Sequence, residues 1–207
     1  MELHLISPGT IALPSFEELA SRVHPYVQAI HLRERNCTAI ELYDALLRLQ
    51  QLGVPAQKLV LNDRVDVGLA AGIGGVHLAH HSLPISQVKS MVNGLRIGRS
   101  VHSVEDALRC EEDGADYLIY GHIYASNSKP GLSPRGLASL KEVTEAVSIP
   151  VIAIGGIGPD QVQEVLREGA QGVAVISGIV YAADPITAAM QYASQLNERR
   201  SCHARNS

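Results

Sequence analysis

The sequence is poor in aromatic residues and in long apolar runs. The first scarcity argues against an aromatic core, and the second argues against a membrane-spanning segment. One Phe and no Trp occur among 207 residues although 46% are hydrophobic, so we expect a core of Ala, Val, Ile and Leu. No apolar run approaches the roughly 18 residues that span a bilayer. The first ten residues, MELHLISPGT, lack a basic segment followed by an apolar core, so we expect no signal peptide. These features predict a globular protein that does not interact with membranes.

Cysteine and positive charge are also scarce. Cys37, Cys110 and Cys202 are odd in number, far apart and without a CxxC pair, which argues against a disulfide framework or a zinc knuckle. This usage favours a reducing compartment, and we expect a cytoplasmic protein. The formal net charge of −4 predicts no general affinity for nucleic acid.

Short apolar runs alternate with amphipathic stretches along the whole chain, with short connections. Eight strand–helix units of this kind suit strands buried on both faces, either in a closed barrel or in a doubly wound open sheet. An open sheet usually has a Gly-rich nucleotide loop after its first strand, and Ser7-Pro8-Gly9-Thr10 is not GxGxxG. The count of eight therefore favours a single-domain α/β fold, the (β/α)8 TIM barrel, over residues 1–198, with 199–207 as a frayed tail.

The expected elements alternate between a buried strand and a helix, and four of the helices end just before a glycine, at Gly53, Gly72, Gly114 and Gly169. The expected strands are Leu3–Ile6, Ala29–Leu32, Leu59–Asn62, Gly75–Leu78, Arg96–Gly98, Tyr117–Tyr120, Val151–Ile154 and Gly172–Ile176. The expected helices are Phe16–Val23, Ala39–Leu52, Arg64–Ala71, Ile85–Val92, Val104–Glu112, Leu137–Val147, Pro159–Glu168 and Pro185–Asn197.

A barrel places its chemistry in the loops that follow the strands. The most informative of these loops lies in Asp116–Leu137, DYLIYGHIYASNSKPGLSPRGL. His122 can take or give a proton near neutral pH. The small polar residues that follow can hold an anion, and they are Ser126, Asn127, Ser128 and Lys129. The alternative is a surface loop with one histidine.

Two further groups of residues predict anion binding. Gly155-Gly156 and Ser177-Gly178 follow strands seven and eight, where many barrels hold a phosphate on backbone N–H groups, although a Gly-Gly pair can also be only a tight turn. Arg33 and Arg35 alternate after strand two and can bind a second anionic group. Their alternative role is a surface ion pair with Glu34 or Asp63.

Five histidines raise the possibility of a metal site. The first strand has no HxH pair, and the chain has no HExxH motif or compact triad of ligands, so we expect no metal and interpret most of these residues as hydrogen-bonded barrel wall. For Asp63, capping of the following helix is at least as good an explanation as metal binding. The histidines are His4, His31, His77, His102 and His122.

Several motifs in order resemble the thiamin phosphate synthase superfamily, and within it most closely the TenI-type thiazole tautomerases, over residues 2–195. Synthases of this superfamily read roughly QxREK on strand two, GQED after strand four and Gly-Pro after strand six. This chain has instead His31, Arg33 and Arg35, then Ala79-His80-His81-Ser82, then Gly121-His122. The motifs that carry the resemblance are HLRER, LNDRVDVGLA, GGVHLAHH, GRSVHS, DYLIYGHIYASNSKPGL, VIAIGGI and GVAVISGI.

The resemblance implies a cofactor-independent isomerase that converts a non-aromatic carboxythiazole phosphate into its aromatic tautomer. His122 would move the proton, and Ser100 or His102 would steady the intermediate. The thiazole-phosphate half of the site would match the residues named above at 126–129, 155–156 and 177–178. Two alternatives stay open: a divergent, Mg²⁺-dependent thiamin phosphate synthase, and a non-catalytic regulator. A homodimer is expected only by analogy with other barrels.

Overall fold

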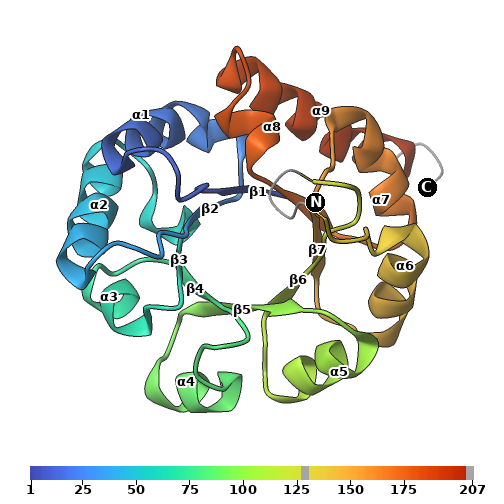
Figure 1. Ribbon diagram of the computed structural model, residues 1–207, viewed down its shortest axis with the longest axis horizontal. Coiled ribbons are helices and arrows are strands. Elements are labelled where there is room, and N and C mark those ends of the chain that lie inside the picture. The colour runs from blue at the N-terminus through green and yellow to red at the C-terminus, as the bar shows by residue number, and fades with distance from the viewer. Residues whose placement is uncertain (127–130, 204–207) are drawn as a thin grey trace.

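The chain forms one closed barrel of eight parallel strands inside a ring of helices (Figure 1). The computed structural model describes residues 1–126 and 131–203. Each strand pairs with the next in sequence, and β8 pairs with β1 to close the sheet. The predicted (β/α)8 fold is therefore confirmed. The strands are β1 (Glu2–Ile6), β2 (Ala29–Leu32), β3 (Leu59–Asn62), β4 (Gly75–Leu78), β5 (Arg96–Val101), β6 (Tyr117–Gly121), β7 (Val151–Ile154) and β8 (Gly172–Val175).

The helices follow the predicted order, with differences at a few ends. The strand β5 continues three residues further than predicted, a short helix α8 follows β8, and α9 runs five residues past the expected boundary at 198; residues 204–207 lie outside the described residues. Short 3₁₀ turns occur at His24–Tyr26, Ala56–Lys58 and Pro159–Gln161. The α-helices are α1 (Leu13–Val23), α2 (Ala39–Gln51), α3 (Val65–Ala70), α4 (Ile85–Met91), α5 (Val104–Glu112), α6 (Gly136–Ala146), α7 (Val162–Arg167), α8 (Ser177–Val180) and α9 (Pro185–His203).

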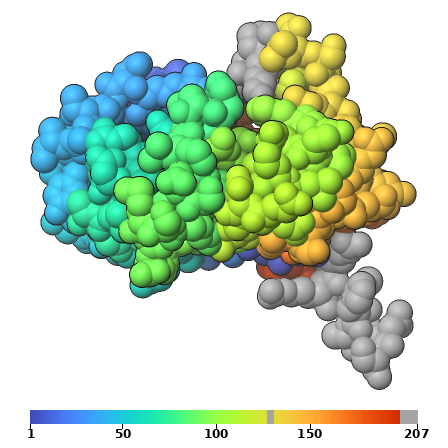
Figure 2. All heavy atoms as spheres, turned by 90° about the horizontal axis from the view of Figure 1, so that it is seen from below, coloured from blue at the N-terminus to red at the C-terminus, as the bar shows by residue number. Residues whose placement is uncertain are grey.

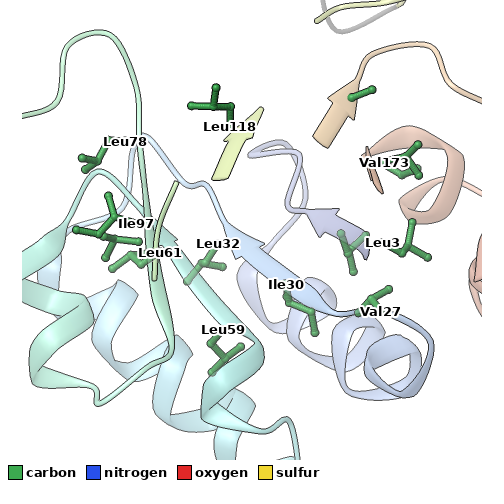
Figure 3. Close-up of a cluster of buried hydrophobic side chains, with 14 of the residues drawn as sticks. Leu3, Val27, Ile30, Leu32, Leu59, Leu61, Leu78, Ile97, Leu118 and Val173 are labelled. Atoms are coloured by element: carbon green, nitrogen blue, oxygen red, sulfur yellow. The ribbon is translucent and has the colours of Figure 1, made fainter. Parts of the chain in front are cut away.

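The main core lies between the sheet and the ring of helices. Alternate strand residues point outward and meet the apolar faces of the helices, as expected for a barrel whose strands are covered on the outside. Figure 3 shows part of this layer, in which Leu3, Ile30, Leu61 and Leu118 come from four different strands. All four are at most 1% exposed. Aliphatic side chains form most of this core, as the composition predicts.

Local signals in the sequence fix where two of the helices begin. Thr38 caps α2 in a capping box with Glu41, and the Ser103 hydroxyl accepts from the backbone N–H of Asp106 at the start of α5. Both helices start directly after a strand-to-helix loop at the mouth of the barrel, which is the end where the strands finish. The caps therefore fix the lengths of these loops.

The side view in Figure 2 shows the helices from α2 to α5 as a continuous outer wall. The chain that leads into α6, drawn in yellow, stands above this wall on the side of the mouth. Among residues 1–126 and 131–203, no helix is long and apolar enough to cross a membrane.

We expect Leu118→Ala to destabilise the protein by about 2–5 kcal/mol, because the substitution leaves a cavity in the fully buried layer between β6 and the helices. The matched control is Leu83→Ala, which truncates a side chain that is 55% exposed and should change stability by less than about 0.5 kcal/mol. Urea unfolding followed by circular dichroism measures both, and equal losses would contradict this assignment of the core.

Candidate active site

An ion pair lies at the lower end of the barrel interior, where the strands begin. The two guanidinium Nη atoms of Arg96, on β5, donate to the two carboxylate oxygens of Glu2, on β1, at 2.8 and 2.9 Å. Burial alone would raise the pKa of Glu2, but hydrogen bonds from His4 and Arg96 outweigh it and lower that pKa to about 2. The guanidinium carbon of Arg96 also lies 4.5 Å from the ring centroid of Tyr117. Glu2 is therefore an anion held between a cation and a histidine.

A chain of hydrogen bonds runs from this carboxylate up through the barrel by way of two histidines. His4 Nε2 lies 2.7 Å from Glu2, and His4 Nδ1 lies 3.0 Å from Nε2 of His31. Burial lowers the pKa of both imidazoles, which favours their neutral forms. An ionised carboxylate only accepts hydrogen bonds, so His4 must carry its hydrogen on Nε2 and accept through Nδ1. His31 must then donate through Nε2, which leaves its Nδ1 as an unprotonated acceptor.

That Nδ1 atom is buried and has no hydrogen-bond partner among the described residues, and the same is true of the amide oxygen of Asn62 on β3. Asn62 lies close enough to His31 to favour its protonated form. Burial nevertheless dominates and holds the pKa of His31 well below its usual range. The two unsatisfied atoms are consistent with a polar ligand or water above the histidine pair, since buried polar atoms are normally hydrogen-bonded.

The opposite wall carries a second polar chain. His77 on β4 lies between two hydroxyls, with Nδ1 3.3 Å from the Tyr117 oxygen and Nε2 2.8 Å from the Ser100 oxygen. Burial is the largest cause that lowers the pKa of His77 to about 3, and the charges of Arg99 and Arg33 add to it. The prediction that the histidines form hydrogen-bonded wall is confirmed for His4, His31 and His77.

The two predicted arginines occupy different environments. Arg33 continues the inward-facing positions of β2 and is half-buried, and its backbone N–H donates to the buried Ser7 hydroxyl at 2.8 Å. Burial and the charge of Arg35 lower the pKa of Arg33. Arg35 itself lies exposed in the loop. The structure therefore brings only Arg33 to the mouth, where its charge acts on His77.

His122 follows β6 directly and is 5% exposed. Its backbone oxygen accepts from the N–H of Arg135, so the loop returns over it before α6 begins. Its ring Nε2 lies 3.2 Å from the carbonyl oxygen of Leu132. A carbonyl only accepts, so the neutral ring carries its hydrogen on Nε2 and leaves Nδ1 as a lone pair. No residue of the described chain hydrogen-bonds this buried Nδ1.

The glycines after β7 pack against this loop. Gly155 and Gly156 have positive φ angles of 100° and 68°, and a Cβ on either would collide with the loop after β6. The collision at Gly155 would be with the Cβ of His122. Close packing thus explains why both positions lack side chains. Ser177 and Gly178 are exposed at the start of α8, and a Cβ on Gly178 would meet the Tyr192 hydroxyl.

Some of the predicted site lies beyond what the structure describes. Ser126 is half-buried beside the mouth, whereas the predicted anion-binding residues Asn127, Ser128 and Lys129 lie outside the described residues. No group of three or more His, Cys, Asp or Glu side chains that could hold a metal ion occurs in residues 1–126 and 131–203.

Sequence reasoning missed two polar residues of the interior. Tyr117 and Arg96 begin β6 and β5, so the alternation of inward and outward positions places them in the lowest layers of the barrel. Arg135 was also missed, and its Nη1 donates to the His102 carbonyl at 2.7 Å, joining the loops after β5 and β6. The alternation of inward and outward positions along the strands could have identified Tyr117 and Arg96, whereas no sequence pattern indicated Arg135.

Comparison with known proteins gives a consistent result. The family described as thiamine monophosphate synthase matches residues 3–179. A thiamine-phosphate synthase of Pyrococcus furiosus is 39% identical over 185 residues, which cover 89% of each chain. One from Chloroflexus aurantiacus is 39% identical over 165 residues, or 77% of this chain and 74% of that protein.

Solved structures agree with the sequence comparison. Thiamine phosphate pyrophosphorylase from Pyrococcus furiosus is similar with a TM-score of 0.82 and 34% identity, covering 95% of this chain and 96% of that one. The 3-hexulose-6-phosphate synthase of Salmonella typhimurium has a TM-score of 0.72 at 19% identity, over 96% and 99% of the two chains. At that identity the likeness shows the fold alone.

We expect the free energy of unfolding to fall as the pH drops from about 6.5 to 4.5. The pKa values of the three buried wall histidines are lowered in the fold, so below about 6.5 the unfolded chain binds more protons than the native one. A group whose native pKa lies below this window, such as His77 with a pKa of about 3, costs about 1.4 kcal/mol per pH unit there. Urea unfolding at several pH values measures the slope.

The matched variant for this prediction is His77→Gln, which cannot titrate. Its slope between pH 6.5 and 4.5 should be shallower than that of the parent by about one bound proton. Identical slopes would mean that His77 is not held neutral in the native barrel.

Proposed function

The chain belongs to the thiamine monophosphate synthase family, and we propose that it acts in thiamin biosynthesis as a thiazole tautomerase, with His122 as its catalytic residue. The proposed substrate is the non-aromatic carboxythiazole phosphate, and the proposed product is 2-(2-carboxy-4-methylthiazol-5-yl)ethyl phosphate. One C–H bond breaks at ring C2 and one forms at the exocyclic side-chain carbon, so the reaction is balanced without a redox partner. Aromatisation supplies the driving force.

The observation that carries this proposal is the state of the His122 ring. Its Nε2–H is engaged by the Leu132 carbonyl, and its Nδ1 is a lone pair without a partner among the described residues. Nδ1 is therefore the atom that would accept the proton from C2. The resulting imidazolium would return that proton from Nδ1 to the exocyclic carbon, while Leu132 keeps the ring from turning.

The substrate has two anionic ends, and the mouth offers a group for each. We assign the carboxylate to Arg33, since a half-buried guanidinium can form two parallel hydrogen bonds with it. We assign the phosphate to the loops after β7 and β8, with Gly155, Gly156, Ser177 and Gly178, and to the residues predicted at 126–129. Arg35, being exposed, would act only through its charge.

A second candidate function is thiamin phosphate synthesis itself. The names of the relatives favour it, since those quoted are synthases at 39% identity. That reaction needs Mg²⁺, which prefers carboxylate and other oxygen ligands. Asp63 is the carboxylate available at the ends of β3 and β4, and its oxygen lies 3.7 Å from the imidazole of His81. This donor set does not fit Mg²⁺, so we rank the synthase second.

We expect His122→Ala and His122→Asn to lower kcat by about 10²- to 10⁴-fold, because general acid–base catalysis contributes that much, while both variants still bind the aromatic product. Aromatisation of the thiazole synthase product, followed by ultraviolet absorbance with and without EDTA, measures the rate. Full activity in either variant would refute the role of His122. Mg²⁺-dependent coupling to the pyrimidine diphosphate, without aromatisation, would instead establish the synthase.

The two arginines provide a second test. We expect Arg33→Ala to raise KM by at least about 30-fold, because truncating one partner of a hydrogen-bonded charge pair costs about 2 kcal/mol or more. Arg35→Ala is the matched control and should raise KM by less than about 5-fold, as expected for an exposed charge. Equal effects of the two substitutions would contradict the assignment of the carboxylate to Arg33.

A further inference from the structure

The chain Tyr117–His77–Ser100 runs from the floor of the barrel to its mouth. Tyr117 and His77 are 1% and 2% exposed, whereas Ser100 is half-buried. All three lie at inward-facing positions of neighbouring strands, β6, β4 and β5. From this geometry we infer that Tyr117 and His77 are positioning residues that hold the Ser100 hydroxyl as a hydrogen-bond donor toward the ligand. The inference deepens the proposed function and rests on it for the identity of the ligand.

The direction of the hydrogen bonds follows from the lower end of the chain. The phenol hydrogen of Tyr117 must find an acceptor because it is buried, and among the described residues its hydrogen-bond partner is His77 Nδ1. If Nδ1 carried a hydrogen, two donors would face each other and the phenol hydrogen would be unsatisfied. Burial raises the pKa of Tyr117, so the phenol keeps its hydrogen. Tyr117 therefore donates and His77 accepts.

A neutral imidazole that accepts at Nδ1 carries its hydrogen on Nε2. His77 therefore donates to the Ser100 oxygen over 2.8 Å. The Ser100 hydrogen then points away from His77. Within residues 1–126 and 131–197 the Ser100 hydroxyl has no hydrogen-bond partner other than His77, so this hydrogen remains available to a molecule in the mouth.

A donor at this position suits one class of ligand, an anion or a group that becomes negative during the reaction. Removing the proton from C2 leaves charge that spreads onto the adjacent carboxylate of the proposed substrate. Ser100 lies on β5, next to β6, the strand that His122 directly follows. Its hydroxyl can therefore stabilise the charge that His122 creates, and a single preorganised donor of this kind contributes about 10²- to 10³-fold in kcat.

Kinetics of a matched pair of tyrosine variants test the positioning role. We expect Tyr117→Phe to lower kcat by about 10-fold with little change in KM, because Ser100 remains but His77 no longer has a fixed tautomer. The control is Tyr120→Phe, which removes a hydroxyl from the other, outward face of the same strand and should leave kcat unchanged; Tyr120 is equally buried at 2% exposed. Unchanged kcat in Tyr117→Phe would overturn the inference.

A double-mutant cycle separates positioning from a general structural effect. If Tyr117 acts through Ser100, then Tyr117→Phe should cost nothing further in a Ser100→Ala background. Additive losses in kcat would mean that Tyr117 acts independently, and the inference would fail.

The last measurement needs no substrate. Nitrogen-15 NMR of histidine-labelled protein, with His77 assigned from the missing signals of His77→Gln, reports which ring nitrogen carries hydrogen. We expect hydrogen on Nε2 in the parent protein and a mixture of tautomers in Tyr117→Phe. Hydrogen on Nδ1 in the parent would overturn the inference even if the tautomerase activity is real. If the protein shows the expected tautomer but has no tautomerase activity, the proposed function is refuted and the inference about His77 stands.

Discussion

The Glu2–Arg96 ion pair is the interaction on which the interior of this barrel depends. It places a fixed anion at the lower end of the barrel interior, below the buried imidazoles of His4 and His31. Every polar group above it must then be satisfied by another protein group or by a ligand. Because a carboxylate can only accept, the hydrogen positions on His4 and His31 follow one after the other. The chemistry of the mouth is thus set in part by a residue at the opposite end of the sheet.

Two considerations bear on the function, and they point to different members of one family. Overall similarity groups the chain with synthases, whereas the residues at the mouth suit proton transfer better than metal-assisted coupling. Percentage identity averages over all aligned positions of the chain. Reaction type depends on a few positions, such as 81 and 122, that weigh little in the average. For this reason we give the site more weight than the names of the relatives.

The fold could be predicted from the sequence because the strands are buried on both faces and separated by glycines and helix caps. All eight strand starts and most helix starts agree within a residue for that reason. The end of β5 was missed because Arg99 and Ser100 are polar residues, which are typical of loops, although Ser100 points inward to His77. The four residues of α8 are too few to show a helical period. Which histidines pair, and which nitrogen of each carries hydrogen, depends on contacts between strands far apart in sequence, and no local pattern encodes them.

The close approach of Gly155 to His122 has a consequence for any redesign of the site. A side chain at position 155 would push the His122 backbone out of place. The contact is with the Cα and Cβ of residue 122, so the requirement for glycine at position 155 holds whatever side chain position 122 carries. Transplanting the His122 loop into another barrel would therefore require transplanting the loop after β7 with it.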